Sequence, residues 1–224
     1  FEATFVGVNS YGKILPSDIE AAIKENTAIV SVIYANNEIG TVSDIAAIAR
    51  VCQSHGVAFH SDLTQALGKV RLDAKSLGLD YASCSAHKIY GPKGIGAAYL
   101  KSDDYGIAPI TAFMHGGEQE SGFRAGTLAV HNIVGFGKAA QIALRDIDIR
   151  EKELRRLDQI MVGKLLGIES IKLTNPTDSR LPGIISIIVD KKDFNNERFL
   201  KHVSDEVALS TGSACSAGEP SYVI

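Results

Sequence analysis

The sequence has no tryptophan, two methionines and three cysteines among its 224 residues. The cysteines, Cys52, Cys84 and Cys215, are too few and too widely spaced for a disulfide framework or for a Cys-x-x-Cys metal site. This scarcity predicts a reducing compartment, and we expect the cytoplasm. The sequence also lacks an uninterrupted apolar run of the roughly 18 residues that a membrane span requires, and its first residues lack the basic-then-apolar pattern of a signal peptide.

A strong excess of charge is missing as well. The formal net charge is −3, from 23 basic and 26 acidic residues. This balance gives no electrostatic reason to expect a membrane or direct binding of a nucleic acid. With 45% hydrophobic and 22% charged residues, the composition is that of a globular protein. The length suffices for one large domain, or for one domain and part of a second.

Short apolar runs alternate with amphipathic segments over the first two thirds of the chain. Residues 27–35 (TAIVSVIYA) are almost free of charge and predict a strand buried on both faces. Asp44 predicts the cap of a helix that ends near Gly56. Further strands are expected at residues 57–61, 81–85 and 95–100. This alternation predicts an α/β fold with a mostly parallel sheet.

The remaining third has a different pattern. A long helix is expected over residues 131–166, and its pairs Asp148–Lys152 and Glu151–Arg155 have the spacing of ion pairs on an exposed face. A strand at 184–189 and a helix at 196–204 follow. We therefore expect a large domain over residues 1–147 and a smaller α+β domain over residues 148–224, with the long helix as connector.

Lys88 follows a predicted strand and has small and hydrogen-bonding neighbours. A lysine in such a place suits holding an aldehyde cofactor such as pyridoxal phosphate as an imine. Ser85 and His87 beside it would then bind the phosphate. The alternative is a surface lysine in a glycine-rich turn, with a structural histidine next to it.

Asp62 and two amides have the chemistry for the rest of such a site. A carboxylate at Asp62 would keep the pyridine nitrogen protonated, although an aspartate after a strand is also a common helix N-cap. Asn37 and Gln65 could hydrogen-bond the phenolic oxygen, or they are ordinary polar residues. Ligands gather at the carboxyl ends of parallel strands, so Asn37, Asp62 and Lys88, which each follow a strand, are expected to converge on one crevice.

Five motifs occur in the order in which they occur in cysteine desulfurases, and they extend over essentially the whole chain. They are Asn36–Gly40, His60–Gln65, Ser85–Gly94, Arg124–Thr127 and Gly212–Cys215. In these motifs the chain resembles that family of fold type I pyridoxal phosphate enzymes, which belongs to the class V aminotransferase group. The Gly212–Cys215 motif resembles the subgroup with a long mobile catalytic loop.

The resemblance implies a role for each site residue. Lys88 would form the imine with pyridoxal 5'-phosphate and move the substrate Cα proton, and Cys215 would take sulfur from the substrate as a persulfide. The cofactor would be held by the residues Asn37, Asp62, Gln65, Ser85, His87 and Lys88, together with Thr127 from the other subunit of a homodimer. The large domain would bind the cofactor and the small domain would carry the cysteine loop.

The implied reaction converts L-cysteine to L-alanine and passes sulfur to an acceptor protein for iron–sulfur cluster assembly, tRNA thiolation or DNA phosphorothioation. A selenocysteine lyase or a small-substrate aminotransferase would use the same scaffold without Cys215, and an inert scaffold that docks sulfur acceptors is a third possibility. No metal is expected, because His115 has no second ligand at metal spacing. Cys52 and Cys84 are expected to be core thiols.

Compared with the family, the sequence lacks the N-terminal phosphate turn and ring-stacking histidine, and it stops before the arginine that grips the substrate carboxylate. We therefore expect the large domain to be incomplete at its N-terminus and the small domain at its C-terminus. Two residues separate Ser216 from Glu219, about two fewer than in the family's loop.

Overall fold

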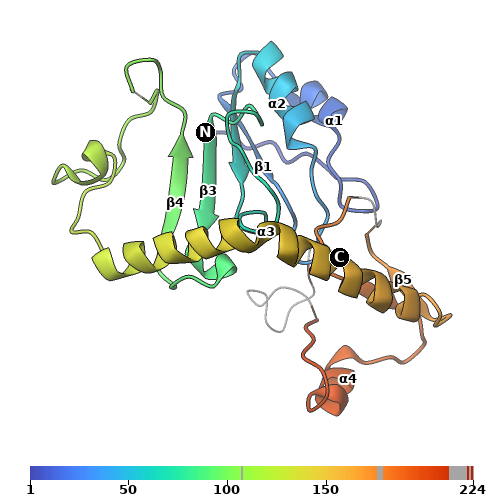
Figure 1. The fold of residues 1–224 in the computed structure, drawn as a ribbon. Helices are drawn as coiled ribbons and strands as arrows, with labels where there is room; N and C mark the ends of the chain where they lie inside the picture. Colours follow the sequence, from blue (N-terminus) through green and yellow to red (C-terminus); the bar gives the residue numbers. More distant parts are fainter. Residues whose placement is uncertain (107, 176–178, 212–220, 222, 224) are drawn as a thin grey trace.

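The computed structural model describes residues 1–106, 108–175, 179–211, 221 and 223. Its larger sheet has four strands in the order β1 (Ile29–Ile33), β2 (Ala58–Asp62), β3 (Tyr81–Ser85) and β4 (Gly96–Leu100). The first three are parallel, and β4 runs antiparallel to β3. The predicted mostly parallel α/β sheet is confirmed. The carboxyl ends of β1, β2 and β3 share one edge, and Figure 1 shows β3 pointing toward the long helix α3.

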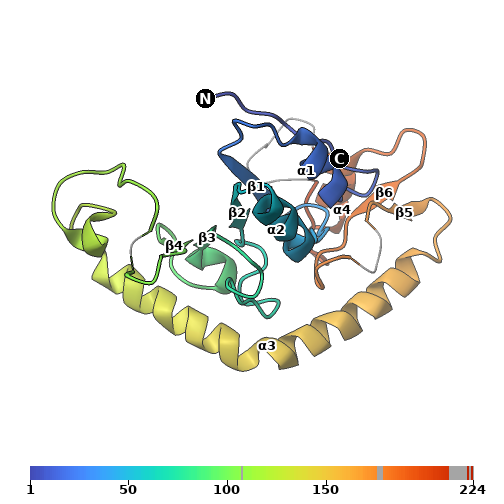
Figure 2. The same cartoon turned by 90° about the horizontal axis from the view of Figure 1, so that it is seen from above.

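Two helices, α1 (Pro16–Ala22) and α2 (Ile45–Ser54), cover one face of this sheet (Figure 2). The side chain of Asp44 accepts a hydrogen bond from the Ala47 amide at 3.0 Å, so the predicted cap of α2 is confirmed. The main core lies between these helices and the sheet. Its buried members include Ile45, Ile48, Cys52, Phe59 and Leu79.

The opposite face of the sheet is more open. In β1 the residues Ile29, Ser31 and Ile33 are exposed, whereas Val32 is buried toward the helices. His60 of β2 hydrogen-bonds Ser31 of β1 at 2.8 Å and Ser83 of β3 at 3.2 Å, and so links three strands on this face. Burial lowers the pKa of His60, and the charge of Asp62 partly opposes that shift.

The helix α3 (Val130–Leu165) has 36 residues and runs past the carboxyl edge of the sheet (Figures 1 and 2). The short 3-10 helix η1 (Ala86–Ile89) follows β3, and Ile89 packs against Ala139 and Ala143 of α3. The division proposed between residues 147 and 148 falls inside α3, and it stays a prediction. Among the described residues, no helix has both the length and the apolar character needed to cross a membrane.

The part of the chain after α3 forms a separate small sheet. The strands β5 (Ile171–Leu173) and β6 (Ile187–Val189) are antiparallel, and α4 (Asn196–Val203) follows with Asn195 as its N-cap. A second 3-10 helix, η2 (Gln119–Gly122), precedes α3. The strand predicted at 184–189 begins only at residue 187. Residues 184–186 lie outside the strand, and the Ile184 amide closes the preceding turn by donating to the Leu181 carbonyl at 3.3 Å.

Candidate active site

Strand register places Asp62 on the open face of the sheet. Asp62 pairs with Ile33 of β1 and with Ser83 of β3, so these three side chains point to the same side. Ser85 lies two residues beyond Ser83 and therefore shares that face. Both Asp62 and Ser85 are half-buried. The ends of two neighbouring strands thus present a carboxylate and a hydroxyl side by side.

The surroundings of Asp62 exclude the alternative role of helix cap. Its Oδ1 accepts the Thr64 amide at 2.8 Å, but the following residues 64–69 form turns and no helix begins there. Among the described residues, no lysine, arginine or histidine forms an ion pair with Asp62. A carboxylate in this position can therefore take a cationic partner such as a protonated ring nitrogen.

Lys88 lies in η1, one turn past the end of β3, and its side chain is exposed. It lines a cavity of about 250 Å³ together with Lys69, Arg150 and Glu151, and with residues 182–184 of the C-terminal part. In the described part of the chain, no carboxylate is within ion-pair distance of Lys88. Its amine is available for covalent chemistry.

The other predicted residues of this chain lie at the same strand ends but do not line that cavity. Gln65 is buried, and its Oε1 accepts a hydrogen bond from Lys69 Nζ at 2.7 Å. Asn37 is exposed in a turn whose shape is held by Asn36, which accepts the amides of residues 38 and 39 at 2.8 and 3.1 Å. His87 is exposed next to Lys88. The sequence analysis did not predict Lys69 as a site residue, although a lysine four residues after Gln65 has the spacing for a side-chain contact with it.

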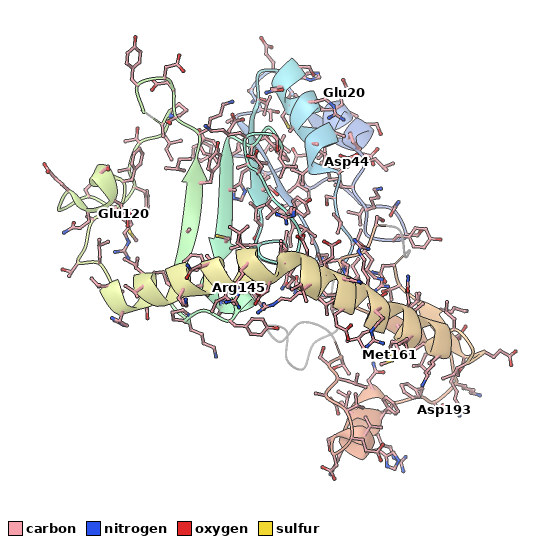
Figure 3. The ribbon with its side chains drawn as sticks, viewed as in Figure 1. Glu20, Asp44, Glu120, Arg145, Met161 and Asp193 are labelled. Carbon is pink, nitrogen blue, oxygen red and sulfur yellow. The ribbon has the colours of Figure 1, made fainter. Side chains whose placement is uncertain are left out.

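Thr127 lies elsewhere in the chain. It is exposed and precedes the first turn of α3, whereas Arg150, which borders the Lys88 cavity, lies twenty residues past Val130. At 1.5 Å per residue this separation is about 30 Å along the helix. Figure 3 shows Glu120 beyond the start of α3 and Arg145 farther along the same helix. Thr127 does not line the cavity around Lys88.

The loop that carries Asn37 is held from the C-terminal part of the chain. Asn175 donates to the Ile39 carbonyl, and the amides of Val42 and Leu181 form backbone hydrogen bonds across the same junction, at 2.7 and 2.8 Å. Cys215 is outside the described residues. Ser221, six positions later in the sequence, donates to Glu38 at 2.7 Å, so the chain returns to the neighbour of Asn37 shortly after the predicted nucleophile.

Cys52 is a core thiol, as predicted, whereas Cys84 is half-buried and packs against the same core. Cys52 is 1% exposed, and burial, with a smaller contribution from the charge of Asp80, raises its pKa to about 11. Burial also raises the pKa of Cys84, whose Sγ lies 3.6 Å from the Ala97 carbonyl oxygen. Neither thiol suits nucleophilic chemistry. Among the described residues there is also no group of three side chains placed to hold a metal ion.

The residues present fit pyridoxal phosphate. Asp62 lacks an ion-pair partner in the described chain and lies on an open sheet face, Lys88 has a free amine, and Ser85 and His87 supply donors suited to a phosphate. These groups come from adjacent strand ends, where ligands of parallel sheets bind.

A family model and several curated proteins match this chain. A family model described as "Aminotransferase class-V" matches residues 1–224. The chain is 41% identical over 226 residues to the cysteine desulfurase IscS of Neisseria meningitidis serogroup A, covering all of this chain and 55% of that protein. The chain therefore spans about half the length of the curated relatives that it matches.

Solved structures of similar proteins superpose on most of this chain. A NifS-like protein from Rickettsia africae superposes with a TM-score of 0.81 at 30% identity, over 93% of this chain and 57% of that one. The structure described as "SspA in complex with cysteine" superposes with a TM-score of 0.75 at 31% identity, over 97% of this chain and 58% of that one.

Proposed function

Because this chain belongs to the aminotransferase class-V family, we propose that the whole protein is a pyridoxal phosphate-dependent cysteine desulfurase, which converts L-cysteine to L-alanine and passes sulfur to an acceptor protein. The observation that carries the proposal is the pair Lys88 and Asp62, both without ion-pair partners in the described chain and both at the ends of neighbouring parallel strands. The similarity to cysteine desulfurases and to a structure described with bound cysteine supports the choice of substrate.

When bound, pyridoxal phosphate supplies an electron sink that stabilises negative charge at the substrate Cα. Asp62 would hold the proton on the ring nitrogen, and the amide of Gln65 and the side chain of Asn37 would bind at the phenolic oxygen. Lys88 Nζ would hold the aldehyde carbon before substrate arrives and then take the proton from Cα. The order of the neighbouring strands β1, β2 and β3, whose carboxyl ends precede Asn37, Gln65 and Lys88, supports these roles.

The sulfur step would belong to Cys215. As a thiolate it would attack the sulfur of the substrate, forming a sulfur–sulfur bond while the substrate carbon–sulfur bond breaks. The carbon fragment keeps the electron pair of the broken bond and takes up a proton to become alanine, and the persulfide remains on Cys215. We also propose a cytoplasmic homodimer in which Thr127 of one subunit binds the phosphate held by the other.

The first test concerns Lys88 in the full-length protein. Lys88→Ala is expected to abolish covalent capture of pyridoxal phosphate, measured by borohydride reduction and peptide mass spectrometry, and to abolish alanine formation. Lys93→Ala is the matched control, because Lys93 is exposed in the adjoining glycine-rich turn. Alanine formation at the wild-type rate by Lys88→Ala would refute the proposal.

Cys215→Ser separates a desulfurase from other enzymes on this scaffold. The variant should bind pyridoxal phosphate and L-cysteine but form neither alanine nor sulfide, because a hydroxyl is a far poorer nucleophile toward sulfur. Mass spectrometry of the alkylated wild type should find an additional sulfur on Cys215 and none on the core thiols Cys52 and Cys84. An unchanged rate of alanine release would favour a lyase or an aminotransferase instead.

A further inference from the structure

Lys69 determines which end of the Gln65 amide is free. Its Nζ lies 2.7 Å from Gln65 Oε1, and Gln65 is only 8% exposed. A lysine ammonium has three donors and no acceptor, so the atom that faces it must be the amide oxygen. The planar amide then presents its NH₂ group on the other side. Within the described chain, no residue accepts a hydrogen bond from that NH₂ group.

Packing holds Lys69 in this position. The preceding Gly68 has a φ of +70°, and an added Cβ there would lie 2.8 Å from Ile89 Cγ2 and 2.9 Å from Ala143 Cβ. The backbone at residue 68 therefore lies directly against η1 and α3, and glycine is required both by the close approach and by the positive φ. The start of the Lys69 side chain is fixed relative to the helix that carries Lys88.

Lys69 also shares the surroundings of Lys88. Both side chains line the same cavity of about 250 Å³. Burial lowers the pKa of Lys69, and the positive charge of Lys88 lowers it further, so the two amines interact electrostatically. Lys69 is therefore the contact that joins Gln65, which does not line the cavity, to the cavity around Lys88.

We propose that Lys69 is a positioning residue that locks the Gln65 amide so that its NH₂ group, and not its oxygen, faces the phenolic oxygen of pyridoxal phosphate. This inference rests on the proposed function. Without a neighbour that only donates hydrogen bonds, the Gln65 amide group could rotate by half a turn, which exchanges its oxygen and its NH₂ group, at little cost in free energy. Its oxygen would then face an anionic oxygen, which is repulsive. Lys69 acts through Gln65 and does not itself touch the cofactor.

The test compares Lys69→Arg with Lys69→Gln in the full-length protein, with the Kd for pyridoxal phosphate as the readout. Arginine is also donor-only and should keep the Kd near that of the wild type. A glutamine amide at position 69 can both donate and accept, so either end of the Gln65 amide could hydrogen-bond to it. The Lys69→Gln variant should therefore no longer fix the orientation of Gln65, and its Kd should be about tenfold higher. Equal Kd values for the two variants would overturn the proposal, since a purely structural contact would accept either residue.

A double-mutant cycle shows whether Lys69 acts through Gln65. The Kd of the combined Lys69→Gln and Gln65→Leu variant should equal that of Gln65→Leu alone. If the double variant instead raised the Kd by the product of the factors of the two single variants, the proposal would be contradicted. Lys75→Gln, at an exposed lysine six residues later, is the matched control and should not change the Kd. Wild-type protein that captures no cofactor on Lys88 would refute the proposed function, whereas normal capture with equal Kd values for both Lys69 variants would refute only this inference.

Discussion

The two roles of Asp62 can be separated at the scale of a single residue. Its Oδ1 accepts the Thr64 amide and shapes the turn after β2, which is a structural role that any acceptor oxygen can fill. Its negative charge has no ion-pair partner among the described side chains, and the proposed contact to the ring nitrogen of the cofactor would use that charge. Substitution by asparagine therefore removes the charge and keeps the turn.

Asp62→Asn in the full-length protein should lower the rate of alanine formation roughly ten- to a hundredfold, because a hydrogen bond to a charged group contributes about 1.5–3 kcal/mol. Its free energy of unfolding in urea should change by less than about 0.5 kcal/mol. Asp73→Asn is a matched control, since Asp73 accepts the Lys75 amide at 3.0 Å in a similar turn on the surface. An undiminished rate in Asp62→Asn would show that the charge is not used.

At the scale of elements, a buried ion pair holds the C-terminal part against the helix α3. Arg180 pairs with Asp158 of α3, and their side chains are 3% and 13% exposed. Arg180 also lies opposite Thr41 in an isolated bridge, next to the loop that carries Asn37. Removal of one partner would leave the other charge buried and unpaired, which costs far more than the loss of a surface pair.

Asp158→Ala should therefore lower the free energy of unfolding by about 3–5 kcal/mol in urea titrations of the full-length protein. The control is Glu153→Ala on the same helix, which breaks the exposed Glu153–Arg156 pair, whose side chains are 53% and 56% exposed. That substitution should cost less than about 1 kcal/mol. Similar losses in the two variants would show that the Arg180 guanidinium is solvated after all.

At the scale of the whole molecule, the proposed homodimer assigns Thr127 to the site of the other subunit. It precedes α3 and lies about 30 Å along the helix from Arg150, which lines the Lys88 cavity. In a two-fold homodimer each subunit can lend the same residue to its partner. Each site would then combine Lys88 of one chain with Thr127 of the other.

Mixed dimers of the full-length protein test this arrangement. A dimer of one Lys88→Ala subunit and one Thr127→Ala subunit should have one intact site and about half the alanine-forming activity of the wild type. A dimer that carries both substitutions in one subunit, beside a wild-type subunit, should be inactive, because each site then lacks one residue. Equal activity of the two mixed dimers would contradict the shared site.

The sequence alone was sufficient for the elements whose signals are local. The strand at 81–85, the helix capped by Asp44 and the long helix near 131–166 follow from apolar periodicity and capping chemistry, and each lies within a few residues of its predicted bounds. The order of motifs also identified the family. These features depend on neighbours in the chain, and for that reason a sequence can report them.

Only the tertiary structure decided which side chains meet across the chain. Asp148 has the spacing for Lys152, yet it pairs with Arg71 at 2.6 Å, because folding brings residue 71 against α3 and a bidentate guanidinium contact becomes available. The predicted pair of Glu151 and Arg155 does form, at 2.7 Å, since it lies within one helix. Ion pairs between distant segments depend on the distance between their charged side chains in the folded protein. The periodicity of a sequence does not contain that distance.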